Sequence, residues 1–131
     1  MSVALSCLAL LLMLPYLLAA FGSWMRKRQL GRVDNQDPRQ QALQLDKRGQ
    51  RIYAAQQNSW EALVLFIAVI VIAYFSGLDP QLLDVPAVVY LLVRILHPLV
   101  YLLGQAYLRS ALAAVGWLSC IYIVVLAFQQ S

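Results

Sequence analysis

Four long apolar runs constrain this chain more than any other feature of its sequence. They cover Val3–Trp24, Ala62–Gly77, Val85–Leu103 and Leu108–Phe128. A transmembrane helix needs about 20 apolar residues at a rise of 1.5 Å per residue. Hydrophobic residues make up 62% of the chain and charged residues 12%, which is more apolar surface than a soluble domain of 131 residues could bury. The sequence therefore predicts an all-α integral membrane protein with four transmembrane helices in a left-handed bundle.

Turn signals between these runs set the expected ends of the helices. The last two runs would together form a helix of roughly 66 Å, about twice the thickness of the hydrocarbon layer, so the chain must turn at Gly104-Gln105. Asp79-Pro80 marks a second turn. Asp37-Pro38 is typical of a helix start with Asp37 as N-cap. Gly49 weakens the helix that follows, so the helix could be interrupted at that position. We expect a single membrane domain over residues 1–131, with helices at about 3–25, 38–76, 81–104 and 108–128.

The positive charges are concentrated in one loop. Of ten Lys and Arg residues, eight lie between Arg26 and Arg51. The turn after the second span has no Lys or Arg, and its charged residues are Asp79 and Asp84. By the positive-inside rule the long first loop is cytoplasmic and both termini lie on the opposite side. The loop also suits contact with anionic lipids. We expect no nucleic-acid partner, because no aromatic side chains alternate with these charges. A cleaved signal peptide is the alternative for the first run, but no basic residue precedes it.

The third span carries polar side chains that hydrocarbon does not tolerate. Tyr90, Arg94, His97 and Tyr101 are spaced so that they fall within a wedge of about 60° on one helix face. An Arg at the centre of a span costs roughly 2.5–3.5 kcal/mol, so this face must contact protein or water. The structural alternative is that Arg94 pairs with Glu61 only to hold two helices together. Intramembrane ionisable groups are more often functional, which favours a ligand-facing role.

Further polar residues lie at the same depth on the other helices. Asn58 and Glu61 stand three residues apart at the cytoplasmic edge of the second span, with Arg51 two turns earlier, and Arg109 opens the fourth span. Together with Tyr101 they predict a site for an anionic, carboxylate-bearing ligand that enters from the cytosol. A guanidinium beside a ligand thiol would favour the thiolate. The chain offers no set of metal ligands, so we expect no metal.

These residues also carry a resemblance to a known family. The segment from Arg51 to Leu63, with Asn58 and Glu61 in an Asn-x-x-Glu pattern, resembles the signature of the MAPEG family, the membrane-associated proteins in eicosanoid and glutathione metabolism. Residues 34–39 resemble a loop motif of its bacterial members. Arg94, His97 and Tyr101, followed by Arg109-Ser110, resemble helices three and four of the microsomal prostaglandin E synthase branch.

The resemblance implies a homotrimer of four-helix subunits, with glutathione as co-substrate between neighbouring subunits near the cytoplasmic face. Glutathione contacts would be Asn58, Glu61, Arg94, His97 and Tyr101, and Arg109 would be the catalytic residue that stabilises the thiolate. Arg26 is a loose match to a further basic contact. One position departs from the family: characterised animal members carry an Arg where this chain has Ala54, and Arg51 is the candidate substitute one turn away.

Three functions follow. The first is a glutathione-dependent membrane transferase or peroxidase acting on lipophilic small molecules from the bilayer, placed by resemblance in a bacterial inner membrane. The second is a non-catalytic member of the family that binds lipid or a thiol, or serves as a trimeric scaffold. The third is a small multidrug transporter, but such transporters carry an acidic residue in helix one, and this chain has none there.

Overall fold

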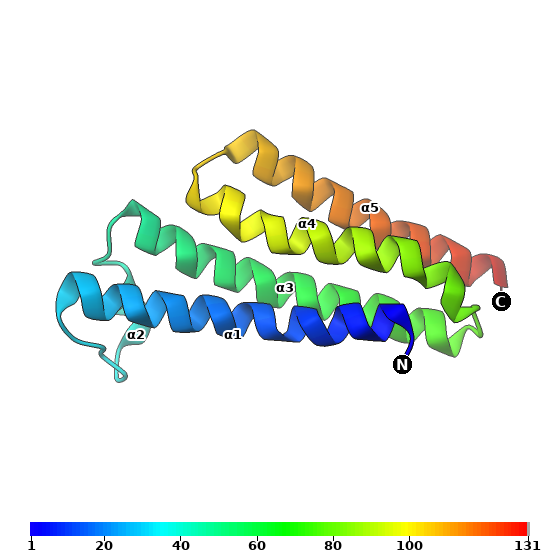
Figure 1. Ribbon diagram of the computed structural model, residues 1–131, viewed down its shortest axis with the longest axis horizontal. Helices are drawn as coiled ribbons and strands as arrows, with labels where there is room; N and C mark the ends of the chain where they lie inside the picture. Colours follow the sequence, from blue (N-terminus) through cyan, green and yellow to red (C-terminus); the bar gives the residue numbers. More distant parts are fainter. Residues whose placement is uncertain (131) are drawn as a thin grey trace.

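The computed structural model describes residues 1–130 and consists of helices joined by short turns (Figure 1). The elements are α1 (Val3–Leu30), α2 (Pro38–Ala42), α3 (Lys47–Phe75), the 3-10 helix η1 (Pro80–Leu83), α4 (Asp84–Leu102) and α5 (Ala106–Gln130). Four segments are long and apolar enough to cross a membrane: Val3–Leu30, Lys47–Phe75, Pro80–Leu102 and Ala106–Gln130. The all-helical fold with four candidate spans is therefore confirmed.

The four long helices lie roughly along one axis. In Figure 1, α1 runs beside α3 and α4 beside α5, and α4 also contacts α1 and α3. At the centre, the rings of Phe66 and Tyr90 stack with centroids 4.4 Å apart and an interplanar angle of 7°. The Tyr90 hydroxyl donates to the Ala62 carbonyl at 2.6 Å, which satisfies its polar atom inside the core. This contact fixes α4 against α3 at the level of the polar residues.

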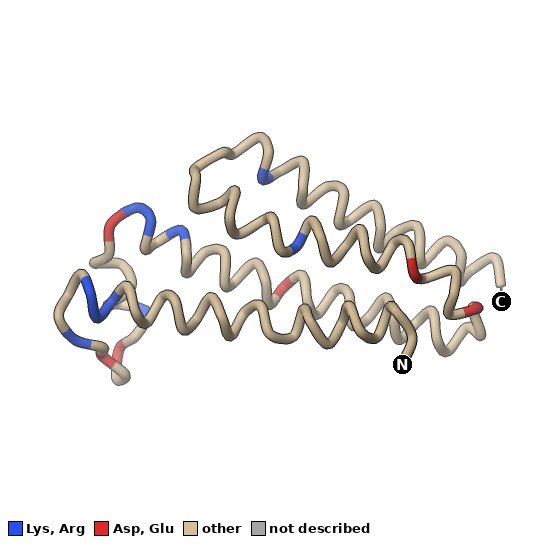
Figure 2. The backbone as a smooth tube through the Cα atoms, in the orientation of Figure 1, with Lys and Arg blue, Asp and Glu red and all other residues tan. Residues whose placement is uncertain are grey.

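The two ends of the bundle differ in charge. Figure 2 shows that Lys and Arg gather at the end that carries the α1–α3 loop, while the N-terminus and residue 130 lie at the other end. A buried network holds this loop: Arg26 on α1 donates to the Asp34 carbonyl at 3.0 Å and to the Gln41 side-chain oxygen at 3.2 Å. Gln41 also accepts from the Asp34 amide at 2.8 Å. The basic segment is thus a folded part of the domain.

The predicted helix over residues 38–76 is wrong, because α2 ends at Ala42 and α3 begins only at Lys47. Asp46 is the N-cap of α3, and its carboxylate accepts from the Gly49 amide at 2.8 Å. A side chain at Gly49 would meet Leu45 at 2.6 Å, so this glycine permits the close return of the chain. The break therefore falls at residues 43–46, a few residues before Gly49, where the sequence leaves a break open.

Asp37 is the N-cap of α2 and Pro38 follows it in the first turn, as predicted, but the Asp37 side chain makes no capping hydrogen bond. Asp34 serves this turn instead: its carboxylate accepts from the amides of Gln36 at 2.9 Å and Asp37 at 3.2 Å. These hydrogen bonds hold the pKa of Asp34 below its usual range. The bond from the Gly49 amide does the same to the pKa of Asp46. Both carboxylates therefore stabilise the loop in their ionised form.

The remaining helix ends differ from expectation by a few residues. α1 continues to Leu30 and ends at Gly31, whose φ of 76° places it in the left-handed region. The predicted turn at Gly104 is present, with a φ of 73°. α5 begins at Ala106, two residues before the apolar run that predicted it. The longer α1 carries Arg26 inside the helix, where its side chain packs against α3.

Candidate functional site

An open groove of about 410 Å³ crosses the surface where α3, α4 and α5 meet. Its polar wall comes from Asn58 and Glu61 on α3 and from Arg94 on α4. From α5, the small Ala113 and Ala114 and the larger Trp117 also line the groove. Three of the predicted site residues therefore meet in one groove.

Arg94 is the anchor of this groove. Its side chain is 6% exposed, and its Nη2 donates to the Asn58 carbonyl at 3.1 Å and to the Asn58 side-chain oxygen. The partner is thus Asn58, and the structural alternative that pairs Arg94 with Glu61 does not match the contacts. Both acceptors are neutral, so they do not balance the positive charge of the guanidinium. Its Nε is buried and has no hydrogen-bond partner within the described residues 1–130.

Glu61 lies on the exposed edge of the same groove. Its carboxylate accepts from the Gln57 amide nitrogen at 3.1 Å, one turn earlier on α3. A negative carboxylate and a positive guanidinium therefore stand on one wall without neutralising each other. Such a wall suits a ligand that carries both charges.

His97, Tyr101 and Arg109 form a second group on α4 and α5. The rings of His97 and Tyr101 meet edge to face with centroids 5.8 Å apart. Arg109 Cζ lies 4.2 Å from the centroid of the Tyr101 ring, a cation–π contact that joins the start of α5 to α4. None of these three residues lines the α3–α4–α5 groove within the described chain. The described chain therefore does not bring all the predicted polar residues into one groove.

Arg51 takes a position that the sequence did not suggest. Its Nη1 donates to the Leu102 carbonyl at 3.3 Å, at the C-terminal end of α4. Any side chain at Gly104 would lie 2.7 Å from the same nitrogen, so Arg51 rests directly on the α4–α5 turn. The Arg51 side chain supports this turn. The sequence predicted that it would share a site with Asn58, but it does not line the groove that contains Asn58.

The residues of α5 that line the groove were not predicted from the sequence. Ala113, Ala114 and Trp117 lack charge, so no polar pattern marked them. A signal was nevertheless present, because small residues such as Gly116 allow close approach of membrane helices. A side chain at Gly116 would meet Val93 at 3.3 Å, which shows how closely α5 lies against α4.

Comparisons with known proteins bear on this arrangement. No curated protein matches the chain. The sequence model of the MAPEG family matches residues 3–129, which includes all four membrane helices and every residue of both polar groups. The protein is therefore an integral membrane protein of the MAPEG family.

Proposed function

We propose that this protein is a glutathione-dependent membrane transferase or peroxidase that acts on lipophilic electrophiles. The observation that carries the proposal is the buried Arg94 guanidinium, which Asn58 holds on the wall of an open groove and which has no carboxylate partner among residues 1–130. Membership of a glutathione-associated membrane family supports the same reading. Glutathione is a co-substrate here.

The two charges on the groove wall fit the charged groups of glutathione. Arg94 would pair with a carboxylate, since charge-assisted guanidinium–carboxylate hydrogen bonds are about twice as strong as hydrogen bonds between neutral groups. Glu61 would accept from the ammonium group. The groove opens on the outside of the subunit, where a neighbouring copy in a homotrimer would cover it. His97, Tyr101 and Arg109 would then contribute to the same ligand.

Arg109 is proposed to act on the thiol. A guanidinium next to the sulfur favours the thiolate over the thiol, and the thiolate is the nucleophile. In a transferase reaction the sulfur attacks an electrophilic carbon, a C–S bond forms, and the leaving group departs with the electron pair. The electrophile would enter from the bilayer beside the apolar faces of α4 and α5.

A glutathione titration of the purified protein in neutral detergent tests the proposal, with thiolate absorbance as the readout. We expect absorbance to rise with saturation in the unchanged protein and to disappear in Arg109→Ala, which removes only a cation–π contact of about 1 kcal/mol and still folds. S-methylglutathione is the matched control, because it carries the same charges without an ionisable thiol. Binding of this analogue with no thiolate from glutathione itself would reject the catalytic function.

The alternative is a non-catalytic member of the family that binds lipid or a thiol, or acts as a trimeric scaffold. The position of Arg51 favours it. This side chain donates a hydrogen bond to the Leu102 carbonyl, so α3 brings no guanidinium to the groove to replace the one missing at Ala54.

For the membrane topology we propose that the loop over residues 26–51 is cytoplasmic and that both termini lie outside, in a bacterial inner membrane. A loop cysteine labelled from the periplasm would contradict this.

A further inference from the structure

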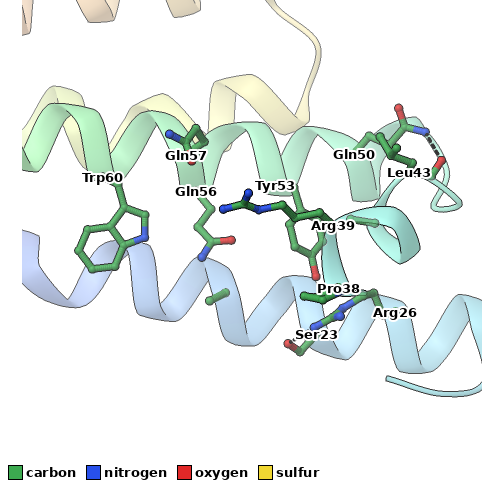
Figure 3. Close-up of a pocket in the computed structure, with 12 residues that line it drawn as sticks. Ser23, Arg26, Pro38, Arg39, Leu43, Gln50, Tyr53, Gln56, Gln57 and Trp60 are labelled. Atoms are coloured by element: carbon green, nitrogen blue, oxygen red, sulfur yellow. Dashed lines mark hydrogen bonds between the residues drawn. The ribbon is translucent and has the colours of Figure 1, made fainter. Parts of the chain in front are cut away.

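Three buried polar atoms have no hydrogen-bond partner within residues 1–130: Nε of Arg26, the hydroxyl oxygen of Tyr53 and Nε of Arg94. Arg26 and Tyr53 line an open groove of about 560 Å³ between α1, α2 and α3, which Figure 3 shows. A space of that size does not select one small occupant. Arg94 differs, because it lines a much smaller cavity.

The small cavity lies where α1, α3 and α4 meet, so α1 replaces α5 as the third helix around Arg94. Ser59, Tyr90 and Arg94 are its polar lining residues, and each is at most 6% exposed. The other lining residues are apolar: Leu11, Leu14, Ala62 and Leu63. The volume of the cavity is about 10 Å³. One buried water molecule needs roughly 10–15 Å³, so the cavity has room for a single water and for no larger ligand.

The polar groups of this cavity match the hydrogen-bonding capacity of a water molecule. Arg94 provides an N–H donor at Nε. The Ser59 hydroxyl donates to the Ala55 carbonyl at 2.8 Å, and the Tyr90 hydroxyl donates to the Ala62 carbonyl at 2.6 Å. Both hydroxyl oxygens keep lone pairs and can therefore accept. One donor and two acceptors are the complement of a water that accepts once and donates twice.

The apolar part of the lining explains why the match is needed. Leu11 and Leu63 bring no acceptor to the Arg94 Nε–H, and a buried donor that forms no hydrogen bond is costly. Buried waters in proteins typically make about three hydrogen bonds to polar groups of this kind. A larger anion would not fit the cavity, and an ammonium ion would meet the positive guanidinium.

We propose that one structural water occupies this cavity, accepts from Arg94 Nε–H and donates to the hydroxyl oxygens of Ser59 and Tyr90. Asn58 holds Nη2 of the same guanidinium from the groove side. The guanidinium is thus fixed at two of its nitrogens, in the orientation that faces the groove. Ser59 is a positioning residue, because it acts on the groove through the water and Arg94.

The effect of Ser59 on glutathione rests on the function proposed above, whereas the water does not. Two measurements therefore separate the proposals. A high-resolution density map of the full chain in detergent, without glutathione, should show one water at hydrogen-bond distance from Arg94 Nε and from Ser59 Oγ. The map of Ser59→Ala should lack this water or show it displaced from residue 59.

Isothermal titration calorimetry with glutathione tests the positioning role. Ser59→Ala should weaken binding by about fivefold, because the water loses one acceptor and the guanidinium is held less firmly. Ser119→Ala is the matched control: its hydroxyl also donates four residues back, to the Val115 carbonyl at 3.0 Å, and Ser119 is 9% exposed outside the cavity. Its effect on affinity should stay below about twofold.

Two results would overturn the proposal. A map in which the cavity is filled by protein side chains, or in which Arg94 Nε bonds to a protein group, would remove the water. Equal losses of affinity in Ser59→Ala and Ser119→Ala would remove the positioning role of Ser59. A water in the map of a protein that does not bind glutathione would confirm the water site and reject the proposed function instead.

Discussion

The regions around Arg26 and Arg94 solve the same physical problem at two depths of the bundle. Each arginine is about 5% exposed, each donates to a main-chain carbonyl and to a side-chain amide oxygen, and each keeps a buried Nε without a partner. In neither case does a carboxylate of residues 1–130 form an ion pair with the guanidinium. Both regions therefore hold a buried positive charge that an added anion at hydrogen-bond distance would stabilise.

The difference between the two regions lies in what surrounds them. Arg94 stands in the middle of α4, where the neighbouring side chains are apolar and its depth alone marks it as unusual. Arg26 stands next to Lys27 and Arg28 in a basic segment, where it looks like one more topology signal. Burial, and not the number of nearby charges, distinguishes these two arginines from solvated ones. Four predictions test how far the parallel extends.

Arg94→Ala should have the largest effect, because it removes both hydrogen bonds to Asn58 in the membrane interior. We expect the free energy of unfolding to fall by about 3 kcal/mol, measured by SDS titration in mixed micelles with circular dichroism. Arg28→Ala is the control, since Arg28 lies over the exposed Trp24 ring with its Cζ 5.1 Å from the ring centroid, and its loss should cost less than about 1 kcal/mol. Equal losses of unfolding free energy in Arg94→Ala and Arg28→Ala would show that the burial of an arginine does not predict its contribution to stability.

Gln41→Ala should have the next largest effect, in the Arg26 region. Gln41 accepts from Arg26 and from the Asp34 amide, and its own amide donates to the Arg32 carbonyl at 2.9 Å. Its loss should destabilise the loop by about 1–2 kcal/mol and speed proteolysis between residues 31 and 46. Gln40→Ala, at the exposed neighbouring position, should leave the cleavage rate unchanged. Equal cleavage of both variants would mean that the loop is held by other contacts.

Ala54→Arg tests whether a guanidinium on α3, one turn before Asn58, strengthens ligand binding beside Arg94. We expect glutathione to bind about tenfold more tightly, or about 1–2 kcal/mol, measured by isothermal titration calorimetry. Arg51→Ala is the companion variant: it should loosen the α4–α5 turn and leave glutathione affinity unchanged, because Arg51 contacts Leu102. Unchanged affinity in Ala54→Arg would favour the non-catalytic alternative.

The smallest expected effect is a pH dependence of the stability of the loop next to Arg26. The lowered pKa values of Asp34 and Asp46 mean that their carboxylates stabilise the loop above the unfolded pKa of 3.8. This stability is lost as pH falls through the lower folded pKa. Proteolytic protection of the loop should therefore persist at about pH 5 and decline below about pH 4. Asp34→Asn with Asp46→Asn should flatten this dependence, and an unchanged decline would assign it to other groups.

The sequence by itself determined the number of spans, the uneven charge and the family resemblance. Apolar runs of this length have one stable solution in a bilayer, because a helix satisfies every backbone polar group internally. The positions of Asn58, Glu61 and Arg94 followed from helical spacing, which places residues three and four apart on one face. Gly104 could be assigned as a turn because one continuous helix would exceed the membrane thickness.

Only the tertiary structure decided which partner each polar side chain contacts. Arg94 bonds to Asn58 rather than to Glu61, and Arg51 lies on the α4–α5 turn, because rotation and approach of the helices set these contacts. The break before Lys47 depends on the close contact of Leu45 with Gly49, and the burial of Arg26 depends on Gln41. Helical periodicity fixes the face of a residue, but the residues opposite that face come from distant parts of the chain, which local spacing does not encode.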